Sequence, residues 1–132
     1  MRFTPLLAIA LTSLAFASLA LTSLGLSGCT ASAPVKSPAE LAAQAAAMTP
    51  SDPRLAGLYA SACKACHAVA GSGAPLAGDA TAWRPRLAKG MPALMQSVVS
   101  GFNGMPAGGQ CFSCTADDYR ALISFMSTAP TR

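Results

Sequence analysis

The stretch Cys63-Lys64-Ala65-Cys66-His67 decides how this sequence is interpreted. A histidine directly follows a C-x-x-C pair, and the C-x-x-C-H pattern is typical of covalent haem attachment. At the end of a helix each thiol can form a thioether to one haem vinyl group, and the adjacent imidazole is held against the iron as an axial ligand. We therefore predict one covalent haem c, attached at Cys63 and Cys66 and ligated by His67.

The same cysteines allow other sites. Cys111-Phe112-Ser113-Cys114 is a second C-x-x-C pair, and two such pairs can build a four-cysteine zinc site. Cys63 and Cys66 can also form a disulfide or a redox-active dithiol. These alternatives leave His67, the only histidine in the chain, without a role. Haem attachment is therefore the favoured interpretation.

A second axial ligand is expected from a methionine, because no second histidine is present and methionine is the usual partner of histidine in electron-transfer haems. Met105 lies within the glycine-rich residues 101–109 and is followed by a proline. Glycine permits a tight backbone course there, and proline stiffens it. Met95 and Met126 follow the apolar spacing of expected helices and are assigned to the core. Met105 is therefore the predicted second ligand.

The first part of the chain has the pattern of an export signal. Only one charged residue precedes Lys36, and residues 3–26 are rich in Leu and Ala. This run ends in Leu26-Ser27-Gly28-Cys29, which resembles the bacterial lipobox, whose cysteine is lipidated and becomes the first residue. The alternative is a retained membrane span, since about 20 apolar residues suffice to cross a bilayer. We expect residues 1–28 to be a lipoprotein signal peptide and Cys29 the lipid anchor.

The rest of the chain divides into a tether and one domain. Residues 29–50 form the lipidated cysteine with an Ala/Pro-rich tether, and residues 51–132 form the domain. Within the tether, Ser37-Pro38-Ala39-Glu40 has the form of a helix-capping box. A helix from Pro38 to Met48 and a disordered segment both remain open, because short isolated helices are marginal in water.

The domain is predicted to be all-α, with three to four helices wrapped around one haem. Asp52-Pro53 is typical of a helix start, and that helix leads to Cys63. A short helix is expected around residues 81–88, and Met91-Pro92 opens another that ends before Gly101. After Thr115, apolar residues follow the i, i+3, i+4, i+7 spacing of a helix face.

The charge pattern excludes a nucleic-acid-binding protein. From Cys29 onward the chain has eight Lys or Arg residues against five Asp or Glu. These basic residues form no run and no patch interleaved with aromatic side chains, so a nucleic-acid-binding surface has no support.

From Leu58 to Met126 the chain resembles a class I cytochrome c of the bacterial cytochrome c5 type. Four stretches carry the resemblance: Cys63 to His67, Gly73-Ala74-Pro75, Ala82 to Gly90, and Gly101-Phe102-Asn103-Gly104-Met105-Pro106. The resemblance implies the small cytochrome c fold, with His67 and Met105 as iron ligands.

Further site residues are implied by the same resemblance. The carbonyl of Pro75 accepts a hydrogen bond from the ligand imidazole, and Trp83 and Arg86 lie near the haem propionates. Trp83 as a plain core residue and Arg86 as a surface charge remain open. Some family members have a C-x-x-C disulfide before the last helix, which implies a Cys111–Cys114 bridge in an oxidising compartment.

The function expected from these features is one-electron transfer between redox protein partners. With both axial positions filled, no small-molecule substrate reaches the iron, and no catalytic residue is expected. The expected location is the bacterial periplasm, anchored to a membrane by lipid, and Thr30 after the lipidated cysteine favours the outer membrane. Lys64 and Lys89 are the basic residues first expected near the docking face. The alternatives are a cytochrome subunit of a dehydrogenase or oxidase complex and, ranked lower, a haem peroxidase or a dithiol oxidoreductase.

Overall fold

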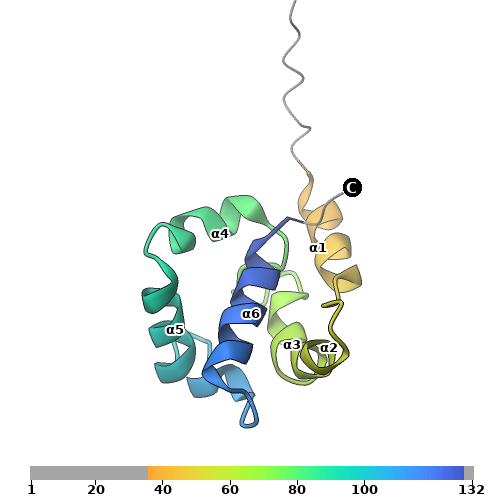
Figure 1. Ribbon diagram of the computed structural model, residues 1–132. Helices are drawn as coiled ribbons and strands as arrows, with labels where there is room; N and C mark the ends of the chain where they lie inside the picture. Colours follow the sequence, from red (N-terminus) through yellow and green to blue (C-terminus); the bar gives the residue numbers. More distant parts are fainter. Residues whose placement is uncertain (1–35, 130–132) are drawn as a thin grey trace, which may run out of the picture. The chain divides into compact units, whose positions relative to one another are not determined.

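The computed structural model describes residues 36–129. Apart from one isolated β-bridge, its regular elements are helical, and the all-α prediction is confirmed (Figure 1). The helices in chain order are α1 (Pro38–Ala47), α2 (Pro53–Leu58), the π-helical turn η1 (Tyr59–Cys63), α3 (Lys64–His67), α4 (Ala80–Leu87), α5 (Met91–Ser100), the 3-10 turn η2 (Ala107–Gln110) and α6 (Ala116–Ser127). The predicted signal peptide and Cys29 lie outside the described residues.

The helix that carries the C-x-x-C-H motif consists of α2, η1 and α3, which follow one another without a break. The Asp52 side chain accepts a 2.8 Å hydrogen bond from the backbone N–H of Leu55, and Pro53 occupies the first turn. These residues start the helix where the sequence predicts it. The π-helical turn ends at Cys63, directly before the turn that presents Cys66 and His67.

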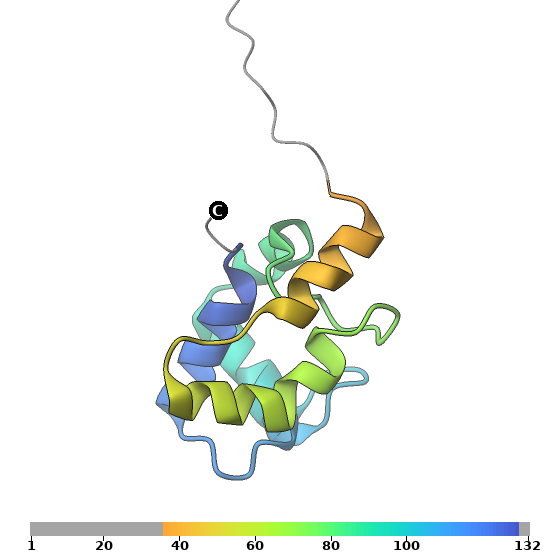
Figure 2. The same ribbon diagram turned by 90° about the vertical axis from the view of Figure 1, so that its right-hand side faces the viewer.

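The first turns of α2 and α6 are joined where the two helices cross (Figure 2). Thr115 and Asp118 form a reciprocal capping box at the start of α6. The same carboxylate forms an ion pair with Arg54, with 2.8 Å between Nη2 and Oδ2. This pair fixes the start of the motif-bearing helix to the last helix.

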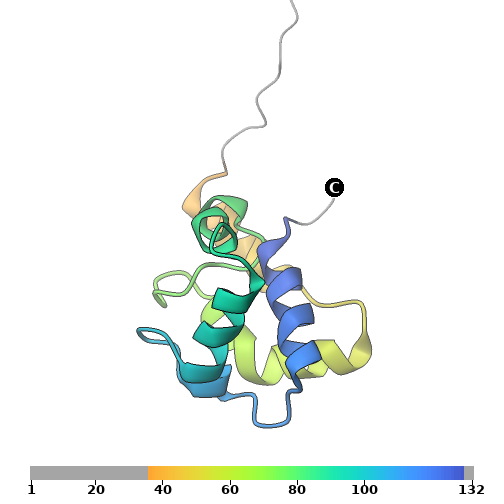
Figure 3. The same cartoon turned by 60° about the vertical axis from the view of Figure 1, so that its left-hand side comes forward.

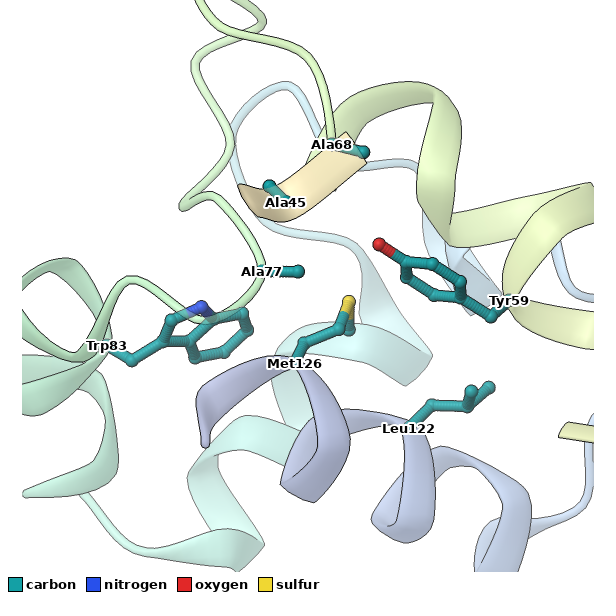
Figure 4. Packing of buried hydrophobic residues seen from close by; sticks show 7 residues of the cluster. All are labelled: Ala45, Tyr59, Ala68, Ala77, Trp83, Leu122 and Met126. Carbon is teal, nitrogen blue, oxygen red and sulfur yellow. The ribbon is translucent and has the colours of Figure 1, made fainter. Parts of the chain in front are cut away.

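A core cluster lies between the helices (Figure 4). Its buried members are Ala45, Tyr59, Ala68, Ala77, Trp83, Leu122 and Met126. The ring of Tyr59 meets Phe125 of α6 edge to face, with centroids 5.1 Å apart, a geometry that stabilises aromatic pairs beyond their burial. The motif-bearing helix is therefore packed firmly against α6.

The segment that the sequence left open between helix and coil forms α1. Its start has the predicted capping box, in which the Ser37 backbone N–H donates to Glu40 over 2.7 Å. Ala45 is fully buried in the core cluster. The packed domain therefore includes residues before Ser51, where sequence placed its start, and from Pro38 onward the chain is not a free tether.

In the part of the chain that the structure describes, no helix has the length and apolar character needed to cross a bilayer.

Candidate functional site

His67 is the last residue of α3 and is buried, with 8% of its surface exposed. Its Nδ1–H donates a 2.9 Å hydrogen bond to the carbonyl of Pro75, the bond that the resemblance implies. Burial lowers the pKa of His67; the bond to Pro75 opposes this shift, and the charge of Arg86 adds to it. The side chain is therefore a neutral imidazole whose Nε2 is left for a metal.

The two cysteines of the motif are free thiols in the structure. Cys63 packs against the core cluster, and burial raises the pKa of its thiol. Cys66 is exposed. The disulfide considered for this pair is not formed, so both sulfurs are left to react with a haem vinyl group.

The second cysteine pair does not join the first. Cys111 and Cys114 form a disulfide with their Cα atoms 5.4 Å apart. Among residues 36–129, no three His, Cys, Asp or Glu side chains converge on a possible metal position. The four-cysteine zinc site considered from the sequence is therefore not assembled in the described structure.

Met105 lies in a tight loop between α5 and η2. Its backbone N–H and C=O pair with those of Phe102 over 3.0 and 2.9 Å. Asn103 adopts a positive φ of 52°, and Gly101 one of 82°. The following turn, η2, contacts both α5 and η1. The η2 turn, which follows Met105, is thus held beside the helical turn that ends at Cys63 (Figure 3).

Tyr119 of α6 holds the η2 turn that follows this loop, a role that the sequence did not reveal. Its hydroxyl lies 3.0 Å from the carbonyl of Gly108 and 2.9 Å from that of Cys111. Tyr119 lies in the helix expected after Thr115, but the sequence pattern indicated no contact for its hydroxyl. The acceptors of its hydroxyl come from the loop that precedes α6 and carry no sequence signal of their own.

Trp83 stands beside His67, with ring centroids 5.9 Å apart and planes at 26°. It is buried in the core cluster, and its indole N–H donates to the carbonyl of Leu76 over 2.9 Å. Arg86 is partly buried and donates to the carbonyl of Ala82 over 2.6 Å. Trp83 is therefore both a core residue and a neighbour of the imidazole, while propionate contacts of either residue stay a prediction.

These residues fit a haem group. A neutral buried imidazole has one nitrogen committed to a carbonyl, and two unpaired thiols lie on the adjoining helical turn. A methionine sits in a loop with a constrained backbone. Imidazole and thioether donors suit haem iron, whereas structural zinc is usually closed by four ligands. Fold and site together define a haem protein of the c type.

The comparisons with known proteins agree with this class. Residues 50–126 match the family described as "Cytochrome C oxidase, cbb3-type, subunit III". Cytochrome c5 of Ectopseudomonas mendocina is 39% identical over 67 residues, which cover 49% of this chain and 77% of that protein. Cytochrome c5 of Azotobacter vinelandii is 42% identical over 67 residues, which cover 49% and 81%.

Solved structures show the same relationship. A mono-heme ferrocytochrome c from Shewanella putrefaciens is 46% identical, with a TM-score of 0.51, and the match covers 58% of this chain and 94% of that one. A cytochrome c in an electron transfer complex with nitrite reductase is 39% identical, with a TM-score of 0.51 and coverage of 58% and 93%. The chain belongs to the class I c-type cytochromes of the cytochrome c5 kind. It carries one covalent haem c and transfers single electrons.

Proposed function

We propose that this cytochrome is a membrane-tethered electron carrier of the bacterial periplasm, with haem attached at Cys63 and Cys66 and iron bound by His67 and Met105. The observation that carries the proposal is the hydrogen bond from His67 Nδ1 to Pro75, because it fixes the ring and leaves one nitrogen for a metal. The disulfide between Cys111 and Cys114 fits an oxidising compartment.

When bound, haem supplies a one-electron couple at its iron. The protein's part is to hold the two axial side chains in one geometry in both oxidation states. The Pro75 bond does this for His67 and raises its basicity. The backbone pairing with Phe102 fixes the loop around Met105, and the Tyr119 hydroxyl fixes the η2 turn that follows it. No side chain of this chain is assigned a catalytic role.

The docking face is proposed next to the Met105 loop. Phe102 is 55% exposed there, and the ammonium of Lys89 lies 6.0 Å from the centre of its ring. An exposed aromatic ring beside a positive charge suits a redox protein with an apolar patch and acidic residues around it. The nitrite reductase complex of a related cytochrome is a precedent for such a protein partner. Lys64, directly after Cys63, is a second candidate.

Lipidation of Cys29 and the outer membrane as the final location are proposed from the sequence around residues 26–30. Detergent should be needed to release the full chain from bacterial membranes, and Cys29→Ser should release it without detergent. Release of both forms without detergent would remove the anchor from the proposal. Stable co-purification with a dehydrogenase or oxidase would indicate a subunit of an enzyme complex, whereas a stand-alone carrier should purify without one.

Substitution of Met105 tests the site itself. Met105→Ala in the holoprotein should abolish the sulfur-to-iron charge-transfer band of the oxidised form and open the iron to carbon monoxide. Met91→Ala, which changes a methionine at the start of α5, is the matched control and should keep the band. An unchanged band in Met105→Ala would show that another methionine is the ligand. A high-spin, five-coordinate wild-type iron would instead favour the peroxidase alternative.

A further inference from the structure

The segment from Pro75 to Gly78, which holds the His67 ring, is itself held by four other parts of the fold. Pro75 accepts from His67 Nδ1 over 2.9 Å, and the backbone N–H of Ala77 donates to the carbonyl of His67 over 2.7 Å. The carbonyl of Leu76 accepts from the Trp83 indole over 2.9 Å. Each of the first three residues of the segment therefore has a backbone group in a hydrogen bond, and two of these bonds go to His67 itself.

The end of the segment is fixed from α6 and from α1. The backbone N–H of Gly78 donates to the carbonyl of Met126 over 2.7 Å. The carbonyl of Gly78 accepts from the side-chain Nε2 of Gln44 over 3.1 Å. The amide oxygen of Gln44 accepts from Lys36, which orients Nε2 toward Gly78. One residue further along α1, Ala45 is fully buried in the same cluster as Ala77 (Figure 4).

Helix α1, at Pro38–Ala47, precedes the stretch of the chain that matches the family, residues 50–126. The contact from Gln44 is thus an addition to the matched domain, and it ends on the segment that orients the iron ligand. A hydrogen bond to the second nitrogen of a metal-bound imidazole raises its basicity, which favours the oxidised metal. Any contact that steadies the acceptor carbonyl therefore acts on the redox equilibrium.

We propose that α1 is a positioning element for the proximal haem ligand, with Gln44 as its positioning residue. Gln44 acts through Gly78 and the segment before it on the Pro75–His67 hydrogen bond, and so helps to set the reduction potential of this cytochrome. The inference rests on the proposed role of His67 as an axial ligand.

The test is Gln44→Leu in the holoprotein, which removes the donor and leaves an apolar side chain of similar bulk. Gln96→Leu is the matched control, because Gln96 is an exposed helical glutamine that bonds only within α5, to Ser100. Gln44→Leu should shift the one-electron equilibrium about threefold toward the reduced form, or about 28 mV at 59 mV per tenfold. Gln96→Leu should leave it unchanged.

Amide hydrogen exchange provides the second measurement, because it separates a local effect from general destabilisation. In Gln44→Leu, exchange at Ala77 and Gly78 should accelerate while exchange within α5 stays as in the wild type. Equal potentials in the two leucine variants, or faster exchange throughout the domain, would overturn the inference. A wild-type protein without covalent haem would overturn the proposed site as well, and its visible spectrum shows this before any variant is compared.

Discussion

Gly101 offers the sharpest test of how the Met105 loop is built, and Gly101→Ala is the change that we develop first. Gly101 has φ 82° and ψ 156° at the end of α5, a backbone region that is essentially restricted to glycine. A Cβ added there would lie 2.9 Å from the carbonyl oxygen of Met105 and 3.0 Å from the backbone nitrogen of Ala107. Both neighbours are backbone atoms of the loop, so the loop itself has to move.

The free-energy cost has two parts, and Gly90 separates them. Gly90 has nearly the same conformation, with φ 81° and ψ 160°, but a Cβ there would meet only a Pro92 side-chain atom at 3.7 Å. Gly90→Ala should therefore cost only the backbone strain, about 1–3 kcal/mol. Gly101→Ala should cost the same strain and, in addition, about 1–3 kcal/mol for overpacking against the loop.

Guanidinium unfolding of the two variants measures the difference, provided that both keep the wild-type denaturant slope. The charge-transfer band of the oxidised holoprotein is the second readout, and it should weaken in Gly101→Ala and persist in Gly90→Ala. Equal losses of unfolding free energy, to within about 0.5 kcal/mol, together with an intact band would refute the view that Gly101 is needed for close approach to the Met105 loop.

Two further predictions concern buried polar groups. The hydroxyl of the fully buried Tyr59 has no hydrogen-bond partner among the described residues. Tyr59→Phe should therefore leave the unfolding free energy unchanged or raise it by about 1 kcal/mol. A clear loss of unfolding free energy, measured with denaturant, would mean that the hydroxyl does have a partner. The Arg54 guanidinium, together with the Thr115 cap, holds the pKa of Asp118 well below its usual range. This carboxylate therefore stabilises the fold above about pH 4, and the stabilisation is lost as the pH falls further. Asp118→Asn should therefore flatten the decline of the unfolding midpoint below about pH 4, and an equally steep decline in both proteins would contradict the assignment.

The features that the sequence predicted well are those carried by neighbouring residues. The C-x-x-C-H motif is contiguous, so its placement at the end of a helix needed no tertiary information. Asp52-Pro53 and Thr115 start helices because a side-chain oxygen reaches a backbone N–H three residues along. The Met105 loop was identified by its glycines, whose backbone freedom is a property of the residue itself.

The features that escaped prediction are hydrogen bonds between residues far apart in the chain. The bond from Gln44 to Gly78 depends on where α1 settles, and an Ala-rich helix without a broad apolar face does not encode its own docking site. The pairing of Arg54 with Asp118 depends on the crossing of α2 and α6. Such contacts are set by packing, so they become visible only with the fold.

The two side chains proposed as axial ligands are held by different means, so each calls for a different measurement. His67 is buried, and the segment that orients it is fixed by bonds from α1, α3, α4 and α6. Met105 is only partly buried, in a surface loop whose shape depends on Gly101 and on the pairing with Phe102. Regions with few buried contacts open at lower free energy than the core does. A change in the loop should therefore be detected first as loss of the proposed methionine ligation. A change behind His67 should leave both proposed ligands in place and alter the potential.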